Sequence, residues 1–214
     1  MKIKNVKIYG LEESIIRSGY PMQVGEPIDF DYEEFDGPIA TTVKEDNRAI
    51  KLANTPIDSG HNNFMKGIIV QFDLQYPEYF SPQLQRYNWI DIVSSQSKMH
   101  KITSRELTKD DFTPQTYQMF IDRINELIWR YNNNPWKGED LVLYGIPIKT
   151  KQQCFNMIVQ NLPSGYLKWM GITTNYLQLK TIYNQRKNHK LEEWKEFCNW
   201  IKTLPMAKEL ILNE

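Results

Sequence analysis

Two stretches of the chain carry donors and cations at a spacing that suits an anionic ligand. The first covers residues 83–98, QLQRYNWIDIVSSQSK, and its candidate contacts are Gln83, Arg86, Ser95, Ser97 and Lys98. Hydroxyls and cations both donate hydrogen bonds to phosphate oxygens, so this stretch is compatible with a phosphate site. The alternative, and the simpler interpretation of the stretch alone, is a core arginine paired with an aspartate such as Asp91, above an ordinary serine turn.

The second stretch covers residues 174–190 and predicts a helix. On a continuous helix Asn175 and Arg186 share one face, about 16 Å apart at a rise of about 1.5 Å per residue, which could span a nucleotide-sized ligand. Asn184 opens the polar, basic run 184–190. The alternative for that run is a solvated helix end whose cations lie near the C-terminal dipole.

His61 is the remaining candidate. It lies in a turn directly before a strand, which is a common place for ligand contacts, although a structural histidine is the alternative. The acidic segment Gly25–Pro38 lacks a defined spacing of ligands, so it predicts a solvated loop and no metal site.

Apolar periodicity predicts the elements that position these residues. The strands are 2–9, 68–76 and 166–173, and the helices are 11–18, 45–53, 114–132, 151–162, 174–186 and 191–201, with 141–147 as a loop or short strand. Helix 114–132 has Thr113 as its cap, and its apolar stripe, which includes Tyr117 and Phe120, predicts core. Residues 83–93 place apolar side chains on nearly every side of a helix, so we expect a buried helix there, with Arg86 in or near the interior.

Composition limits the class of protein. The 214 residues fit one large domain or two small ones, and 26 basic residues balance 26 acidic ones, which argues against duplex nucleic acid as the main partner. A small phosphorylated ligand needs only two or three cations. Cys154 and Cys198 fall in predicted helices without a CxxC motif, which indicates buried thiols in a reducing compartment. No apolar run approaches 18 residues, so we expect a soluble, cytoplasmic protein without a membrane span.

The two stretches together resemble the flavin-dependent thymidylate synthase family. There a strand leads into a helix with Gln-x-x-Arg, here Gln83–Arg86, and a second stretch contains Leu-Pro, an Asn twelve residues after the Pro, and Asn-Leu-Arg, here Leu162-Pro163, Asn175 and Asn184–Arg186. His61 and Phe64 resemble the family's His-containing turn. The likeness covers residues 48–100 and 160–198, and it extends to small relatives of the family in phages of low-GC bacteria.

The chain departs from the family at the chemistry. The family's Arg-His-Arg triplet reads Arg86-Tyr87-Asn88, and Ser94 or Ser95 stands where the family has an acidic residue. Its Ser-x-Arg matches Ser97-Lys98-Met99 or Ser95-Gln96-Ser97, so its arginine is missing. Lys98 or His100 could replace that charge but not the bidentate fork of a guanidinium.

The resemblance implies a single α+β domain over residues 1–214, with a central, mostly antiparallel sheet, flanking helices and a buried helix at the core of a homotetramer. It implies FAD as cofactor, dUMP as the pyrimidine deoxynucleotide and methylene-tetrahydrofolate as the one-carbon donor, in sites shared between subunits of a cytoplasmic protein (in the host cytoplasm if phage-encoded). Arg186 would be catalytic by polarising the uracil. The nucleotide would contact Gln83, Arg86, Ser95, Ser97, Lys98, Asn184 and Arg186, and flavin would contact His61, Arg86 and Asn175.

Two functional classes remain open. The protein could be an enzyme that adds a methyl or hydroxymethyl group to C5 of dUMP with a reduced flavin. It could instead be a non-catalytic nucleotide-binding phage accessory or regulatory protein that has kept the fold and lost the flavin chemistry.

Overall fold

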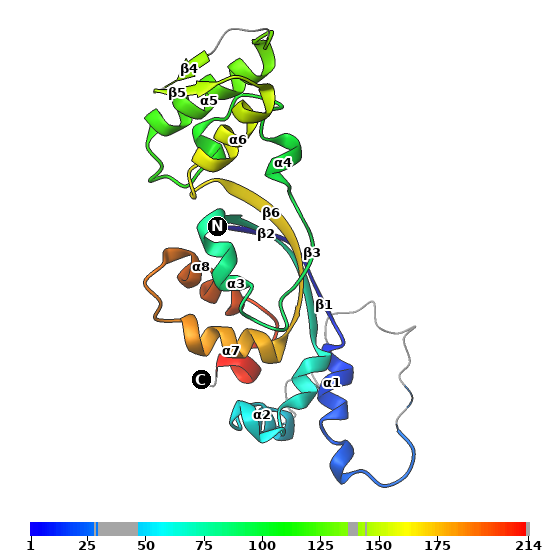
Figure 1. The fold of residues 1–214 in the computed structure, drawn as a ribbon. Helices are drawn as coiled ribbons and strands as arrows, with labels where there is room; N and C mark the ends of the chain where they lie inside the picture. Colours follow the sequence, from blue (N-terminus) through cyan, green and yellow to red (C-terminus); the bar gives the residue numbers. More distant parts are fainter. Residues whose placement is uncertain (28, 30–46, 137–140, 144, 213–214) are drawn as a thin grey trace. The chain divides into compact units, whose positions relative to one another are not determined.

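The computed structural model describes residues 1–27, 29, 47–136, 141–143 and 145–212. These form two compact units, drawn in Figure 1. Unit 1 comprises Met1–Leu74, Leu84–Ser94 and Gly171–Glu214, and unit 2 comprises Gln75–Gln83 and Ser95–Met170. The chain therefore passes several times between the units, and each is described by itself.

A four-stranded sheet has the strand order β1-β2-β6-β3. Its strands are β1 (Lys2–Tyr9), β2 (Ile69–Pro77), β6 (Leu167–Asn175) and β3 (Asp91–Ser95). The backbone N–H of Glu78 donates to Tyr166 O at 3.1 Å, and that of Tyr176 donates to Ile68 O at 3.1 Å. Numbering thus rises along β2 as it falls along β6, as an antiparallel pair requires. The predicted α+β class with an antiparallel sheet is confirmed.

The alternation of β2 is also confirmed. Ile68, Val70, Phe72, Leu74 and Tyr76 are all buried. The intervening residues from Ile69 to Gln75 are half-buried or exposed, because successive side chains of a strand point to opposite faces. The predicted first strand begins and ends as expected, and the strand predicted at 166–173 is β6, shifted by one or two residues.

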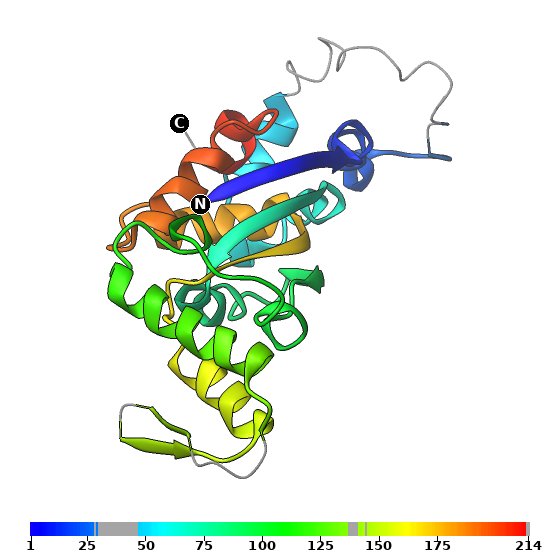
Figure 2. The ribbon, with the colours of Figure 1, turned by 90° about the horizontal axis from the view of Figure 1, so that it is seen from above.

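Unit 1 is built around α7 (Tyr176–Arg186), whose residues from Tyr176 to Tyr183 are buried except for the half-buried Thr181. Figures 1 and 2 show α8 (Glu192–Ile201) beside α7. The predicted N-terminal helices are α1 (Leu11–Arg17) and α2 (Asn47–Ala53). A π-helical turn, Lys208–Leu212, ends the described chain and packs on α7. The helix predicted over residues 174–186 therefore lies at the core of unit 1.

Unit 2 is centred on two helices that pack together, α5 (Gln118–Asn133) and α6 (Lys151–Asn161), with the hairpin β4 (Leu141–Leu143) and β5 (Ile146–Ile148). Its core includes Ile121, Ile124, Leu127, Ile128, Cys154 and Ile158. The start of helix 114–132 was predicted too early, because α5 begins after Tyr117 and Thr113 does not cap it. Tyr117 and Phe120 are exposed, so their assignment to the core was wrong.

The buried helix predicted over residues 83–93 is wrong. Helix α3 (Ser81–Leu84) ends almost at once, two turns closed by backbone bonds from Tyr87 to Leu84 and from Ile90 to Tyr87 follow, and β3 then begins. The β-branched residues Ile92 and Val93 favour a strand. A helical wheel shows only where apolar residues lie and takes no account of β-branching. Arg86 is exposed in the turn instead of lying in the interior.

The remaining predictions concern the acidic segment, metal sites, membrane spans and the two cysteines. Most of the acidic segment Gly25–Pro38 lies outside the described residues. Within the described residues, no three metal-ligating side chains gather, and no helix has the length and apolarity needed to cross a membrane. Cys154 and Cys198 are buried free thiols, as expected.

Candidate functional site

Arg186, the predicted catalytic residue, is fixed at the C-terminal end of α7 in unit 1. Its Nε donates to the hydroxyl of Tyr87 at 2.7 Å, and that hydroxyl donates to Oε1 of Gln185 at 3.1 Å. The guanidinium carbon lies 4.7 Å from the ring centroid of Trp194 and 5.6 Å from that of Tyr87. Two buried rings and one hydroxyl therefore determine where this cation lies.

The charge of Arg186 is not neutralised by a carboxylate in the part of the chain that the structure describes. The face of Trp194 attracts the guanidinium through the ring quadrupole, which holds the cation but leaves its positive charge in place. Burial together with the charges of Arg186 and Lys190 lowers the pKa of His189, which favours a neutral imidazole beside the cation. The end of α7 thus presents one positive group that is positioned before any ligand arrives.

Asn175, predicted to contact flavin, caps the N-terminus of α7. Its Oδ1 accepts the backbone N–H of Gln178 at 2.9 Å. It also lines a pocket of about 240 Å³ with Lys66, Gln178 and Trp89. The side chain of Gln178 accepts the backbone N–H of Trp89 at 3.3 Å, and Trp89 is about half exposed at this pocket.

The other predicted contacts in unit 1 lie on its surface. His61 is exposed in the turn after Gly60, whose φ of +77° is the left-handed conformation that glycine adopts without strain. Arg86 and Asn184 are exposed as well. These three residues are therefore accessible to a ligand, and they lie outside the pocket that Asn175 and Trp89 line.

Unit 2 contains a pocket of about 590 Å³ with a basic lining. Its cationic or titratable nitrogens come from Lys98, His100, Lys101, Arg105 and Lys168. Its neutral donors include Ser97 and Gln96, which follow β3, and Gln75 at the end of β2. Two of the predicted nucleotide contacts, Ser97 and Lys98, therefore share one cavity. Ser95 is exposed beside it on β3, and Gln83 is half-buried on α3.

One carboxylate joins two lysines of this pocket. Glu78 Oε2 lies 3.0 Å from Lys98 Nζ, and Glu78 Oε1 lies 2.9 Å from Lys168 Nζ. Burial raises the pKa of Glu78, but the hydrogen bonds from Lys168 and Lys98 outweigh burial and bring it below its ordinary value. Burial lowers the pKa of Lys168, but its hydrogen bond and charge attraction to Glu78, together with the effect of Tyr76, raise it above its ordinary value. Glu78 and Lys168 are therefore both charged at neutral pH.

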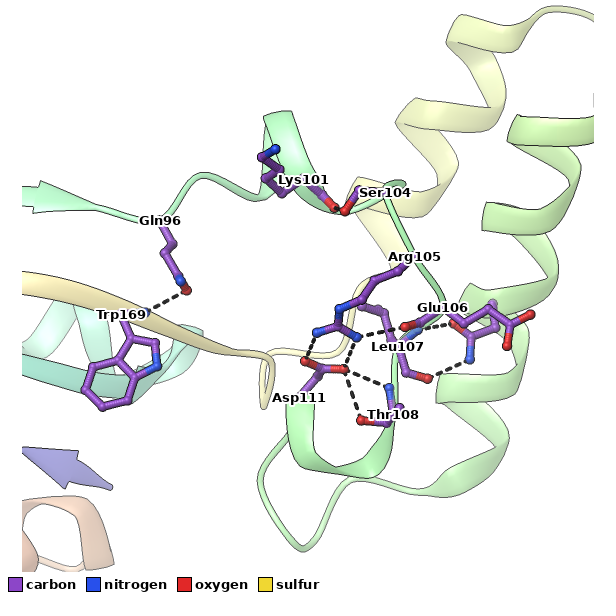
Figure 3. Close-up of polar contacts among 10 residues, drawn as sticks. Gln96, Lys101, Ser104, Arg105, Glu106, Leu107, Thr108, Asp111 and Trp169 are labelled. Atoms are coloured by element: carbon purple, nitrogen blue, oxygen red, sulfur yellow. Dashed lines mark hydrogen bonds and ion pairs between the residues drawn. The ribbon is translucent and has the colours of Figure 1, made fainter.

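Arg105 lines the pocket and is held by several hydrogen bonds, which Figure 3 draws. Its two Nη groups bind the two oxygens of Asp111 at 2.8 and 2.5 Å, and Nη1 also donates to Glu106 O at 2.8 Å. The backbone N–H of Thr108 donates to Asp111 at 2.8 Å in a capping box. Gln96 bonds across to Trp169 in both directions, with its N–H donating to Trp169 O at 2.9 Å. These hydrogen bonds flank the short segment that contains Lys98 and Lys101 and help to hold it in place.

Sequence reasoning missed Glu78, Lys168 and the role of Tyr87. Glu78 and Lys168 are far apart in the sequence and meet only because β2 and β6 pair, so neither stretch alone could reveal them. A signal was present for Tyr87, which stands at the family's histidine position. A tyrosine hydroxyl there can still donate and accept, and the structure shows it doing both.

Comparison with known proteins finds similarity in structure but not in sequence. No protein-family model and no curated protein sequence matches the chain. Solved structures do match. A crystal structure of flavin-dependent thymidylate synthase from Helicobacter pylori, complexed with FAD and dUMP, aligns with a TM-score of 0.66 at 12% identity, over 100% of this chain and 99% of that chain. A second structure of that enzyme, with FAD and dUMP, aligns with a TM-score of 0.69 at 12% identity, over 100% and 98%. The resemblance is confirmed for the fold over the full length.

Proposed function

We propose that the protein binds dUMP and transfers a methyl or hydroxymethyl group to C5 of its uracil with a reduced flavin. One observation carries the proposal most directly: within this fold, Arg186 is held by Tyr87 and Trp194 with no carboxylate partner among the described residues. A cation positioned in advance stabilises negative charge that develops on a bound pyrimidine, since no reorganisation is needed when the charge appears.

The donors of unit 1 fit FAD. Its diphosphate suits the exposed nitrogen groups of Arg86 and His61, and its flat ring system suits the indole of Trp89 beside Lys66 and Asn175. FAD, when bound, supplies the hydride for the reduction that follows transfer from a methylene-tetrahydrofolate donor. Tyr87 and Asn88 replace the two basic residues of the family's triplet, so Arg86 is the cation of that triplet left to hold an anion.

The protein's own contribution is placement and electrostatics. Arg186 polarises the uracil and favours the anionic form of its ring. Ser97 and Lys98, which line the pocket of unit 2, donate to the nucleotide together with Ser95 and Gln83, and Asn184 lies two residues before the C-terminal end of α7. Shared sites in a homotetramer, as in the family, belong to the same proposal.

Replacing the two arginines tests the pocket assignment. Arg186→Ala and Arg86→Ala should each weaken dUMP binding by more than about tenfold, or roughly 1.4 kcal/mol, because each removes an uncompensated cation. Calorimetry measures the dissociation constants, and Arg123→Ala, an exposed arginine of α5, is the matched control. Unchanged dissociation constants in both variants would remove the assignment.

Titration with FAD separates the two functional classes. Flavin fluorescence should be quenched saturably, and more tightly when dUMP is present, if the protein is an enzyme. The replacement of His-Arg by Tyr87-Asn88 favours the second candidate, a nucleotide-binding accessory or regulatory protein without flavin chemistry. Binding of dUMP without any binding of FAD would establish that second candidate and reject the first.

A further inference from the structure

The proposed function uses Lys98 as a donor, but it does not use the link from Lys98 through Glu78 to Lys168. Lys98 comes from the first turn of α4 (Lys98–Lys101), Lys168 from β6, and Glu78 from the residue after β2. Each ammonium group binds a different oxygen of the same carboxylate. Because those oxygens belong to one group, the two ammonium groups lie close together at the wall of the pocket.

The arrangement is largely buried, which makes its charges effective. The side chains of Lys98, Glu78 and Lys168 are 26%, 19% and 18% exposed. Charges at such depth are screened less by salt than surface charges. Lys168 also lies 5.6 Å from the ring centroid of Tyr76, which fixes the path of its side chain.

The charges of the pocket do not balance. Glu78 offsets one of the two lysine charges, and Asp111 is already paired bidentately with Arg105. Lys101 adds a further cation, and among the described residues no carboxylate forms an ion pair with it. With Asp110 as the remaining carboxylate of the lining, the pocket keeps an excess of positive charge inside a protein whose formal net charge is zero.

We propose that Lys98 and Lys168, aligned by Glu78, form a binding site for a phosphomonoester, with Lys101 and the hydroxyl of Ser97 completing its donors. Each ammonium group has three N–H donors, and Glu78 takes one of them, so both can also donate to a phosphate oxygen. The site takes the 5′-phosphate of the nucleotide, a step that rests on the proposed function, or an inorganic phosphate of the same chemistry.

Glu78 is a positioning residue in this site. Without a counter-ion, two neighbouring ammonium groups repel each other and the long lysine side chains spread apart. The carboxylate holds them in the binding arrangement before the ligand arrives, which lowers the ordering cost of binding. A phosphate dianion then adds to an existing cluster of charges and need not assemble it.

Lysine substitutions measured with three probes test the site. Calorimetry of the full chain should show that Lys168→Met and Lys98→Met each weaken dUMP binding at least tenfold, whereas Lys168→Arg stays within about threefold of the original. Binding of deoxyuridine, which has no phosphate, should not change between the original chain and Lys168→Met. Lys151→Met removes a cation of unit 2 outside the pocket and should leave dUMP binding unchanged. Circular dichroism confirms that each variant folds.

Inorganic phosphate distinguishes failure of this site from failure of the proposed function. In amide NMR spectra, phosphate should shift the signals of residues 97–101 in the original chain and not in Lys168→Met. If dUMP fails to bind the original chain but these shifts appear, the phosphate site stands and the nucleotide function falls. If Lys168→Met binds dUMP as the original does, or if phosphate shifts the same signals in both chains, the site proposed here is rejected.

Discussion

At the scale of single residues, Tyr87 decides what Arg186 can do. The residue is 8% exposed, and its hydroxyl accepts from Arg186 and donates to Gln185. It also packs edge-on against Trp194 with ring centroids 5.9 Å apart. Tyr87, which departs from the family's pattern, therefore helps to position Arg186, which matches that pattern.

Removing the Tyr87 hydroxyl should weaken nucleotide binding without unfolding the protein. Tyr87→Phe keeps the ring contacts and deletes the bond that orients the guanidinium, so we expect the dissociation constant for dUMP to rise about fivefold, or about 1 kcal/mol. Calorimetry measures the affinity and thermal melting measures stability. Tyr9→Phe, a tyrosine exposed on β1, is the control. An affinity equal to that of the original chain would show that the Trp194 face alone positions Arg186.

At the scale of elements, Asn175 has a structural role as the cap of α7, which can be tested separately from its predicted contact with flavin. Asn175→Ala removes the cap of α7 and should lower the free energy of unfolding by about 1 kcal/mol. Asn175→Asp keeps an oxygen acceptor and should retain stability, since a carboxylate also suits a helix N-terminus. Urea denaturation measures both values. If Asn175→Ala is as stable as the original chain, the capping bond contributes nothing measurable.

Elements were predictable from sequence where one periodicity dominates. Strand β2 alternates cleanly, and the helix predicted over 151–162 stops before Pro163, so both followed from the pattern. The extent of α7 also followed, but its burial did not, because Gln178 and Lys180 are polar side chains that the core accommodates through hydrogen bonds.

The largest error, over residues 83–93, has a physical cause. An apolar residue at every angle of a helical wheel is equally compatible with turns and a short edge strand, and β-branching then decides. The candidate site was predictable only in part for a related reason. Ser97 and Lys98 lie in one segment, whereas Glu78 directly follows β2 and Lys168 lies on β6, and the sequence did not specify that these strands pair. The single domain and the tetramer stay predictions.

At the scale of the whole molecule, Lys180 connects stretches that are far apart in the chain. Its ammonium group donates to Ala53 O at 2.6 Å and to Leu210 O at 3.0 Å, and its side chain is 1% exposed. Burial lowers its pKa from 10.5 to about 8. The free energy of unfolding therefore depends on pH through this group.

The direction of that dependence follows from proton binding. Below pH 8 Lys180 is protonated in the folded and unfolded chains, and the cost of its buried charge is present in full. Between about pH 8 and 10.5 the unfolded chain binds more protons, so Lys180 contributes a stability that rises with pH. From pH 7 to pH 10 the contribution amounts to roughly 2 kcal/mol. The raised pKa values of Cys154 and Cys198 act in the opposite direction.

A comparison with Lys180→Met isolates this effect. The free energy of unfolding in urea, measured for both chains at pH 7 and pH 10, should change in favour of the original chain at the higher pH. Lys208→Met, which removes an exposed lysine from the same C-terminal segment, should show no such change. An equal response of the original and Lys180→Met chains would mean that Lys180 titrates normally in the folded state.

The two buried cysteines can be used to measure local opening of the protein structure. Cys154 lies in unit 2 and Cys198 in unit 1, both are buried, and burial raises the pKa of each thiol to about 11. A thiol reagent can modify either one only when the surrounding structure opens, so the rate of modification reports that opening. Mass spectrometry of the two cysteine peptides would measure the rate of local opening of each unit separately, in the natural sequence and without an introduced label.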